Sequence, residues 1–346
     1  MRVISLQREK ARTLIAVAAV LFLLGMGLFI RSFLNEQYAP VNPSDKKSID
    51  VVIPNASSAR QVAVLLKEKN LIHSEAAFLG YCKKMGYDSR LKAGHYRLSR
   101  SQSLASIAEH IASGRVVNIS FTIPEGYTVM QIKKLLIQKK ICTEAEWNDA
   151  MKADYNYAFL DEVPSQKIER LEGFLFPETY SISEDCSIKQ VINMMLGSFD
   201  QIWKQELASQ ARAQKRSVYE TVILASLIEK EARVAEERPI ISGVIMNRLK
   251  AGMPLQIDAS VLYALQQHKE NVSYADLKVD SPFNTYKYPG LPAGPIACPG
   301  KASLEAALNP AKHSYYYYVY KGDGTHSFSR TYSEHLAAVR KYSSHQ

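Results

Sequence analysis

The stretch LASLIEKEARVAEERPIISGVIMNRLKAGMPLQID, from Leu224 to Asp258, begins as a continuous apolar helix pattern, and the apolar residues resume after a charged triplet. Glu229, Lys230 and Glu231 form that triplet at the most apolar end of the predicted helix. A carboxylate leaves water only at a cost of several kcal/mol unless it is paired, hydrogen-bonded or protonated. Two carboxylates at this position therefore need a specific reason.

The two carboxylates cannot serve as one facing acid pair. Between Glu229 and Glu231 a helix turns by about 200°, so their side chains leave on nearly opposite faces. A lone carboxylate in an apolar helix face suits a general acid, because burial raises its pKa toward the working pH. The alternative is structural, since Arg233, Arg238 and Arg248 are close enough in sequence to neutralise the acids.

Composition restricts the class of protein. The chain has 346 residues, of which 47% are hydrophobic and 22% charged, so two or three globular units are expected. The net charge of +9 favours an anionic neighbour such as lipid headgroups, nucleic acid or an acidic polymer. The basic residues are dispersed, and there is no Walker loop or dinucleotide fingerprint. We therefore expect no nucleic-acid partner and no cofactor.

Cysteine and histidine residues form no ligand motif. His326 and His335 lack metal-ligand spacing, so no metal site is predicted. The cysteines could pair in an oxidising compartment, but burial as small hydrophobic residues is favoured. They are Cys82, Cys142, Cys186 and Cys298.

The N-terminus predicts a membrane anchor. Residues 1–12 are basic, and the apolar run 13–30 would be about 27 Å long as a helix, close to the hydrocarbon thickness of a bilayer. We predict a cytoplasmic tail over 1–12, a transmembrane anchor over 13–34 and an extracytoplasmic location for the remainder. A cleaved signal peptide is the alternative, with a small-residue site at Gly25 to Gly27. The apolar run continues past that site, which favours the retained anchor.

A polar linker, 35–48, precedes an internal repeat. The segments that begin at Ile53 and Ile123 match without a gap at a shift of 70 positions, each with Ile-Pro, a turn and two helix patterns. Residues 49–165 therefore predict small α+β modules, with Leu91 to Ser99 as a hairpin strand. Their pattern resembles LysM-like glycan-binding modules, and the alternative is that they only space the next domain.

Several later segments carry a stronger resemblance. They are LEGFLFPETY from Leu171, ASLIEKEARVAEERPIISGVIMNRL from Ala225, MPLQIDASVLYAL from Met253, SPFNTYKYPGLPAGPIACPG from Ser281, and the tail LNPAKHSYYYYVYKGDGTHSFSRTYSEH. In this order they resemble the signature segments of the endolytic murein transglycosylase family, MltG or YceG-like. The likeness runs from about Ile53 to His335 and includes the anchor.

This resemblance implies an α+β lytic transglycosylase catalytic domain over residues 166–346. Such enzymes cut the bond between MurNAc and GlcNAc inside peptidoglycan strands and leave 1,6-anhydro-MurNAc ends, with one Glu as general acid and then base. Glu231 matches that position best, although Ala232 follows it where relatives of lysozyme-like fold usually carry a small hydroxyl residue. Glu229 is the second candidate.

Further residues are candidates for substrate contact. Gln256 and Asp258 lie in one predicted loop, and Asn284, Thr285 and Tyr286 in another. Amides and aromatic rings suit acetamido sugars, through hydrogen bonds and stacking. Asp258 and Asn284 are alternatively turn or cap residues.

Glu178 lies in a segment, Gly173 to Tyr180, that is predicted mainly to pack against the catalytic helix. It is a further candidate cleft residue. Tyr315 to Tyr318 read as a half-buried strand.

Two other functions stay open. A hydrolase of the same glycan would use Asp258 as its second carboxylate, about 6.5–9.5 Å from the acid. A non-catalytic wall-binding scaffold would use Glu229 and Glu231 as salt-bridged structural acids. The expected partners are peptidoglycan strands and the inner membrane, and the resemblance adds peptidoglycan synthases.

Overall fold

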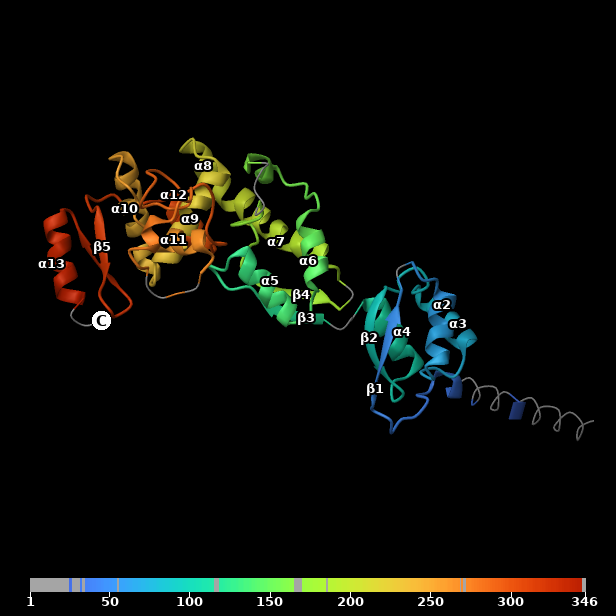
Figure 1. Cartoon of the computed structure of the whole chain (residues 1–346). Helices are drawn as coiled ribbons and strands as arrows, with labels where there is room; N and C mark the ends of the chain where they lie inside the picture. Colours follow the sequence, from blue (N-terminus) through green and yellow to red (C-terminus); the bar gives the residue numbers. More distant parts are fainter. Residues whose placement is uncertain are drawn as a thin grey trace, which may run out of the picture. The chain divides into compact units, whose positions relative to one another are not determined.

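The computed structural model describes residues 25–26, 32, 35–54, 56–114, 118–164, 170–184, 186–267, 269 and 272–343. The chain divides into two compact units, one of residues 1–119 with 182–185 and one of residues 120–181 with 186–346. The described elements are helices and three two-stranded sheets, which confirms the predicted α+β class (Figure 1).

The predicted tail, 1–12, and anchor, 13–34, lie outside the described residues except for positions 25, 26 and 32. Within the described part of the chain, no helix is long and apolar enough to cross a bilayer.

The first unit is a two-stranded sheet covered by three helices. Strands β1 and β2 pair antiparallel, with Val51 opposite Tyr96, and both side chains are fully buried. The buried tyrosine is satisfied because its hydroxyl donates to the carbonyl of Lys92 at 2.8 Å. The elements are β1 (Ser48–Ile53), α2 (Ala59–Glu68), α3 (Glu75–Met85), β2 (Gly94–Ser99) and α4 (Leu104–Ser113).

The second copy of the repeat forms β3 (Asn118–Thr122), α5 (Val129–Gln138) and α6 (Glu144–Met151). Capping boxes start the first helix of each copy, at Ser58 with Gln61 and at Thr128 with Gln131. Asn70 and Lys140, again 70 positions apart, follow the ends of these two helices and have positive φ values of 58° and 57°. The two copies therefore share a strand–helix–helix unit. The helices of the first copy belong to the first compact unit and those of the second copy to the second unit, and β3 runs across the boundary. Their likeness to LysM modules remains a prediction.

The remaining elements belong to the second unit, except that β4 runs across its boundary. They are η1 (Ala158–Glu162), β4 (Thr179–Ser183), α7 (Ile188–Ile202), η2 (Trp203–Leu207), α8 (Ala208–Ala213), α9 (Val218–Glu231), η3 (Ala235–Glu237), α10 (Arg238–Lys250), α11 (Asp258–Leu265), η4 (Asp276–Lys278), α12 (Lys301–Leu308), β5 (Tyr317–Tyr320), β6 (His326–Ser329) and α13 (Tyr332–Ser343). The predicted boundary at 165 and 166 falls on residues 165–169, outside the described part.

Helix α9 is the centre of the second unit. Helices α8, α10, α11 and α12 all contact it, and Figure 1 shows α10 to α12 gathered around it. Every residue from Thr221 to Ile228 is buried, which explains why the sequence is apolar around the whole helix. The charged end that follows, from Glu229 to Glu231, leaves this buried environment.

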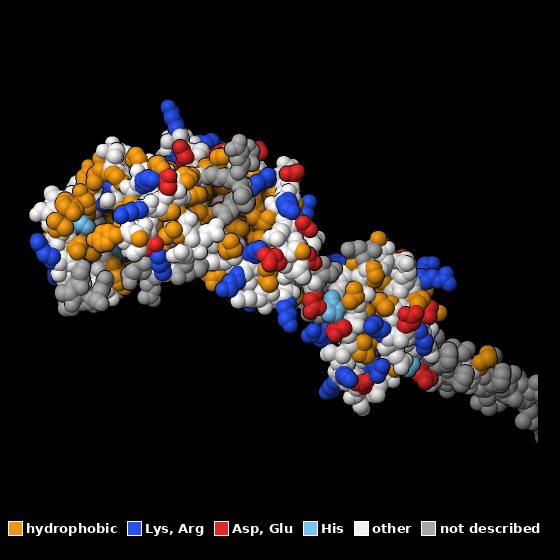
Figure 2. Space-filling view, viewed as in Figure 1, with side chains coloured by type: hydrophobic (Ala, Val, Ile, Leu, Met, Phe, Trp, Pro, Cys, Tyr) orange, Lys and Arg blue, Asp and Glu red, His pale blue; other side chains and the backbone are white. Residues whose placement is uncertain are grey.

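Two surface and thiol features complete the description. All four cysteines are free, and three of them, Cys82, Cys142 and Cys298, are buried. On the face in Figure 2, Lys and Arg side chains lie scattered among acidic ones instead of forming one stripe.

Candidate functional site

A cleft of 830 Å³ opens at the charged end of α9, within the second unit. The end of α9, the segment that leads into α11, and the β5–β6 hairpin all contribute to its walls. Its lining includes five of the predicted site residues: Glu229, Glu231, Gln256, Asp258 and Tyr286.

The position of Glu231 follows from how α9 begins and ends. Ser217 caps the helix with Glu220 in a capping box, and the buried run that follows fixes the rotation of the helix. Glu231 is the last helical residue, because Ala232 is already extended, with φ of −74° and ψ of 126°. Its carboxyl group therefore leaves the core at the helix terminus, where the cleft opens.

The carboxyl group of Glu231 has a specific donor. The Tyr318 hydroxyl donates to Oε2 of Glu231 at 2.7 Å. Burial raises the pKa of Glu231, and the negative charge of Asp258 raises it further. The hydrogen bond from Tyr318 and the neighbouring side chains of His326 and Arg233 lower the pKa of Glu231. The net result is a carboxyl group that holds its proton to a higher pH than an exposed Glu.

The Tyr318 hydroxyl stays protonated over the pH range in which Glu231 ionises, so it remains a hydrogen-bond donor. Burial raises its pKa well above the ordinary value, and the neighbouring charge of Glu231 raises it further. The phenol therefore keeps its proton and can stabilise an ionised Glu231.

Glu229 has structural partners. Its carboxylate accepts a hydrogen bond from the backbone N–H of Gly300 at 3.1 Å, and Arg238 Nη2 lies 3.8 Å from it. Its side chain is 7% exposed. A buried carboxylate held by a backbone donor and an arginine fits the salt-bridge interpretation of this acid.

Asp258 and Tyr286 form a second polar pair in the cleft. The Tyr286 hydroxyl donates to Asp258 at 2.5 Å, and burial raises the pKa of this phenol. Gln256 precedes the pair with φ of 53°, and its N–H donates to the carbonyl of Thr285 at 3.1 Å. The two loops that the sequence singled out are thus joined side by side.

Asn284 and Thr285 do not line the cleft, because both side chains are buried. Asn284 Nδ2 donates to the carbonyls of Leu277 and Val279, and Thr285 Oγ1 accepts from the N–H of Ile257 at 2.9 Å. These contacts hold the loop that carries Tyr286 against the segment that carries Gln256. In this position the two side chains support the loop, and their contact with substrate stays a prediction.

Glu178 also lies away from the cleft lining. It is exposed, and its carboxylate accepts from the hydroxyl of Ser198 at 3.1 Å.

Sequence reasoning assigned no role to His326, although it lines the cleft beside Tyr318 at a ring-centroid distance of 5.5 Å. Glu237 accepts from the backbone N–H of His326 at 2.8 Å and lies 2.6 Å from its Nδ1. The segment SYYYYVYKGDGTHSFS was part of the family resemblance, which is the signal that could have pointed to Tyr318 and His326.

Arg248 is a second missed residue. It was considered as a partner for the acids, but its guanidinium donates to the carbonyls of Leu255 and Tyr316, at 2.7 and 2.6 Å. These hydrogen bonds hold the segment that carries Gln256 beside the residue that precedes strand β5.

Comparison with known proteins places the chain in a family. The model of the YceG-like family matches residues 51–341. A protein of Bacillus subtilis named endolytic murein transglycosylase is 37% identical over 88% of this chain and 87% of its own length. A Streptococcus pneumoniae protein of the same name is 30% identical over 90% of this chain, which spans 62% of that relative.

A solved structure is also similar. The crystal structure of a YceG-like protein from Listeria monocytogenes is 34% identical, with a TM-score of 0.57 over 84% of this chain and 99% of that one. The family model covers far more than half of the sequence, and the Bacillus relative is matched over most of its length. The chain therefore belongs to the YceG-like family.

Proposed function

We propose that this chain is an endolytic murein transglycosylase that cleaves the β-1,4 bond between MurNAc and GlcNAc within glycan strands and leaves 1,6-anhydro-MurNAc ends. The observation that carries the proposal is the carboxyl group of Glu231, which has a raised pKa and lies in the cleft, where it accepts a hydrogen bond from Tyr318. The names of the relatives support the same activity.

Glu231 would act twice in one cycle. In its protonated form it donates a proton to the glycosidic oxygen, and the bond from that oxygen to C1 breaks through an oxocarbenium-like transition state. The resulting carboxylate then takes the proton of the C6 hydroxyl on the same MurNAc, and that oxygen bonds to C1. Glu231 ends the cycle protonated, so the reaction needs neither water nor a second carboxylate.

The neighbours of Glu231 fit these two stages. Burial favours the protonated acid of the first stage, and the Tyr318 hydroxyl stabilises the carboxylate of the second. Gln256, Asp258 and Tyr286 offer amide, carboxylate and phenol groups to the sugar in the same cleft.

One observation favours a hydrolase as the second candidate. Asp258 lines the same cleft and its charge raises the pKa of Glu231. A carboxylate there could orient a water molecule in an inverting hydrolysis, which requires a separation of about 6.5–9.5 Å. The products would then carry reducing ends.

Mass spectrometry of digested glycan separates these functions. Purified uncrosslinked strands are incubated with the full-length chain and with Glu231→Gln. Fragments that carry new 1,6-anhydro-MurNAc ends, formed by cleavage within the strands, support the transglycosylase. Fragments with new reducing ends support the hydrolase. An intact substrate would leave only the wall-binding scaffold.

We further propose that the chain is a single-pass protein of the inner membrane with its catalytic unit outside the cytoplasm, next to peptidoglycan synthases. The support is the basic segment 1–12 and the apolar run 13–30. A reporter enzyme that is active only outside the cytoplasm, fused after Gln346, should be active, and the chain should stay in membranes after a high-salt wash. A shortened soluble product would favour signal cleavage instead.

A further inference from the structure

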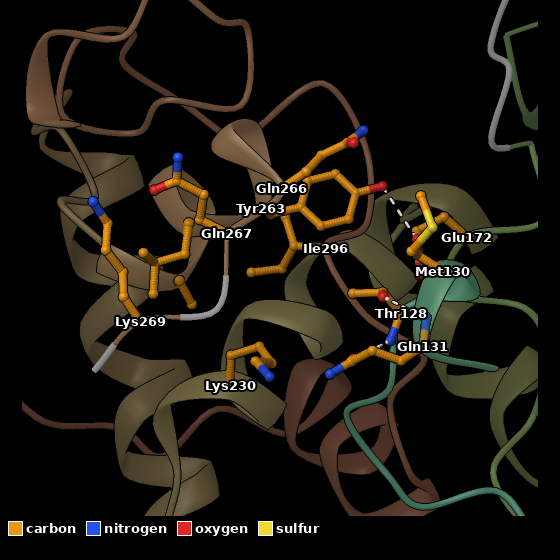
Figure 3. A pocket seen from close by; sticks show the side chains of 12 residues that line it. Thr128, Met130, Gln131, Glu172, Lys230, Tyr263, Gln266, Gln267, Lys269 and Ile296 are labelled. Carbon is orange, nitrogen blue, oxygen red and sulfur yellow. Dashed lines mark hydrogen bonds between the residues drawn. The ribbon is translucent and has the colours of Figure 1, made fainter. Parts of the chain in front are cut away.

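A second cavity, of 430 Å³, adjoins the cleft in the same unit (Figure 3). The two adjoin at the end of α9 and the first turns of α11, because four side chains line both: Lys230, Ala259, Leu262 and Lys269. A substituent that leaves the cleft past these four side chains would enter the second cavity.

The second cavity is mainly apolar. Its nonpolar wall includes Met130, Leu262, Tyr263 and Ile296. Figure 3 labels Met130, Tyr263 and Ile296 among the side chains around the hollow. Met130 is 56% exposed although it is a large hydrophobic residue. Side-chain amides from Gln131 and Gln266 add hydrogen-bonding groups. Such a wall can accept the aliphatic side chains of a peptide, and the amides beside it can bond to the peptide backbone.

Lys230 gives the junction of the two cavities a positive charge. It is exposed, and among the described residues no carboxylate lies within ion-pair distance of it. The hydrogen bond found for its Nζ is a long one, 3.4 Å, to the carbonyl of Gly126. Lys269, also at the junction, is instead paired with Asp276 at 2.6 Å. Lys230 is thus the cation available for an acidic ligand.

The one carboxylate of this cavity already has donors. Glu172 is 4% exposed and accepts from the N–H of Val129, at the start of α5, and from the Tyr263 hydroxyl at 3.2 Å. A helix N-terminus stabilises a carboxylate, so Glu172 is compensated inside the protein. The exposed charge that remains for a ligand is that of Lys230.

We propose that this second cavity binds the peptide stem of murein, with Lys230 contacting a stem carboxylate. The inference rests on the proposed function, because it requires the glycan to lie in the adjoining cleft. In murein the stem is joined to MurNAc through its lactyl group, and it is the acidic, peptide part of the substrate. An acidic peptide attached to a sugar in the cleft would fit three features of the second cavity. The cavity adjoins the cleft, its wall is apolar, and Lys230 lies at the border between the two.

Binding measurements on the full-length chain in detergent test this proposal. Glu231→Gln serves as the background, so that the ligand is not cleaved. Two soluble glycan fragments of equal length are compared by calorimetry, one with peptide stems and one from which an amidase has removed them. We expect tighter binding of the stem-bearing fragment.

Two variants locate the preference. Lys230→Met should weaken binding of the stem-bearing fragment by about fivefold, the scale of one partly exposed charged contact, and should affect the peptide-free fragment less. Met130→Glu adds a negative charge in the first turn of α5, where the helix tolerates it, and should have the same selective effect. Lys250→Met is the matched control, because this exposed lysine on α10 lines neither cavity.

The outcomes are distinguishable. Equal binding of both fragments by the parent, or an equal loss for both fragments in Lys230→Met, overturns the stem site while leaving the proposed function intact. If the parent binds neither fragment and the active chain yields no anhydro ends, the proposed function fails and the stem site falls with it.

Discussion

At the scale of single residues, the charged triplet that ends α9 divides three tasks among neighbouring positions. Consecutive helical residues are rotated by about 100°, so the three side chains point in three directions. Glu229 meets Gly300 and Arg238, Lys230 reaches the junction of the two cavities, and Glu231 meets Tyr318 in the cleft. The two carboxylates at this apolar helix end therefore have different surroundings: Glu229 has structural partners, and Glu231 faces the cleft, where we propose that it acts as the acid.

Glu231→Gln should remove activity without unfolding the chain. The amide keeps the size of the side chain and can still accept from Tyr318, but it cannot transfer a proton. Loss of general acid–base catalysis typically lowers the rate by about 10²–10⁴-fold. The production of anhydro ends by parent and variant gives the measurement.

The same variant should be more thermally stable than the parent at pH 8. Because burial raises the pKa of folded Glu231, its ionisation destabilises the folded state as pH rises through that pKa. The advantage of Gln should shrink toward pH 4, where Glu231 is protonated in both folded and unfolded chains. Glu229→Gln serves as the comparison and should lower the melting temperature, because it weakens the contacts with Gly300 and Arg238.

Tyr318→Phe should change the pH profile of the reaction. The hydroxyl lowers the pKa of Glu231, so its removal extends the protonated form to higher pH and should move the alkaline limb of kcat/KM upward. The base stage loses a charge-assisted donor, so kcat should fall by roughly tenfold. An unchanged alkaline limb in the variant would show that Tyr318 does not influence the pKa that limits the reaction.

The sequence could narrow the acid to two residues but could not choose between them by rotation alone. The choice depends on partners that are distant in the chain, since Tyr318 lies 87 positions from Glu231 and Gly300 lies 71 positions from Glu229. Asn284 and Thr285 show the same limit. Their polarity suggested ligand contact, but buried amides and hydroxyls serve equally well to hold loops, and only the tertiary contacts distinguish these uses.

At the scale of elements, helix starts were readable because capping is local. Three helices begin with a capping box between the N-cap residue and the residue three positions later, at Ser58, Thr128 and Ser217. The sequence pattern and the hydrogen bonds that it predicts therefore lie within one helical turn. Strand partners were less readable. β5 begins at Tyr317 and pairs with β6 across a turn, and the short tyrosine run did not fix which of its members would reach the cleft.

Gly243 on α10 is a point where elements meet closely. A Cβ there would lie 2.4 Å from the carbonyl oxygen of Ala311 and from Nε2 of His313. Gly243→Ala should therefore destabilise the folded chain by about 1–3 kcal/mol through overpacking. The displaced 311–313 segment leads into β5, so activity should fall as well.

Gly80→Ala is the matched control, measured by urea unfolding beside Gly243→Ala. Gly80 lies within α3, and no heavy atom comes within 4 Å of a Cβ built there. Alanine should raise stability by about 0.5–1 kcal/mol, because it restricts the unfolded chain and favours the helix. Equal effects of the two changes would mean that the contact with 311–313 is not tight.

At the scale of the whole molecule, the repeat and the compact units divide the chain differently. The first copy, with β1 and β2, has its own hydrophobic core that includes Tyr96 and Phe78. The second copy packs with the unit that carries the cleft, and α6 contacts α7. Sequence similarity at a shift of 70 positions predicts that the two segments form the same helix pattern, but it does not predict with which partner each one buries its apolar face.

This division predicts how fragments behave. A fragment of residues 35–119 should unfold cooperatively, because it keeps the core of the first unit intact. A fragment of residues 48–164 should be less soluble and should bind a hydrophobic dye, because it separates α5 and α6 from α7 and exposes apolar residues such as Trp147.

If the first unit binds glycan, as a LysM-like module would, the 35–119 fragment should also pellet with purified sacculi. Circular dichroism during a thermal ramp and a sacculus pull-down measure both properties on one preparation. A folded 35–119 fragment that stays in the supernatant would assign this unit a spacing role, whereas an unfolded one would show that its core needs contacts from the second unit.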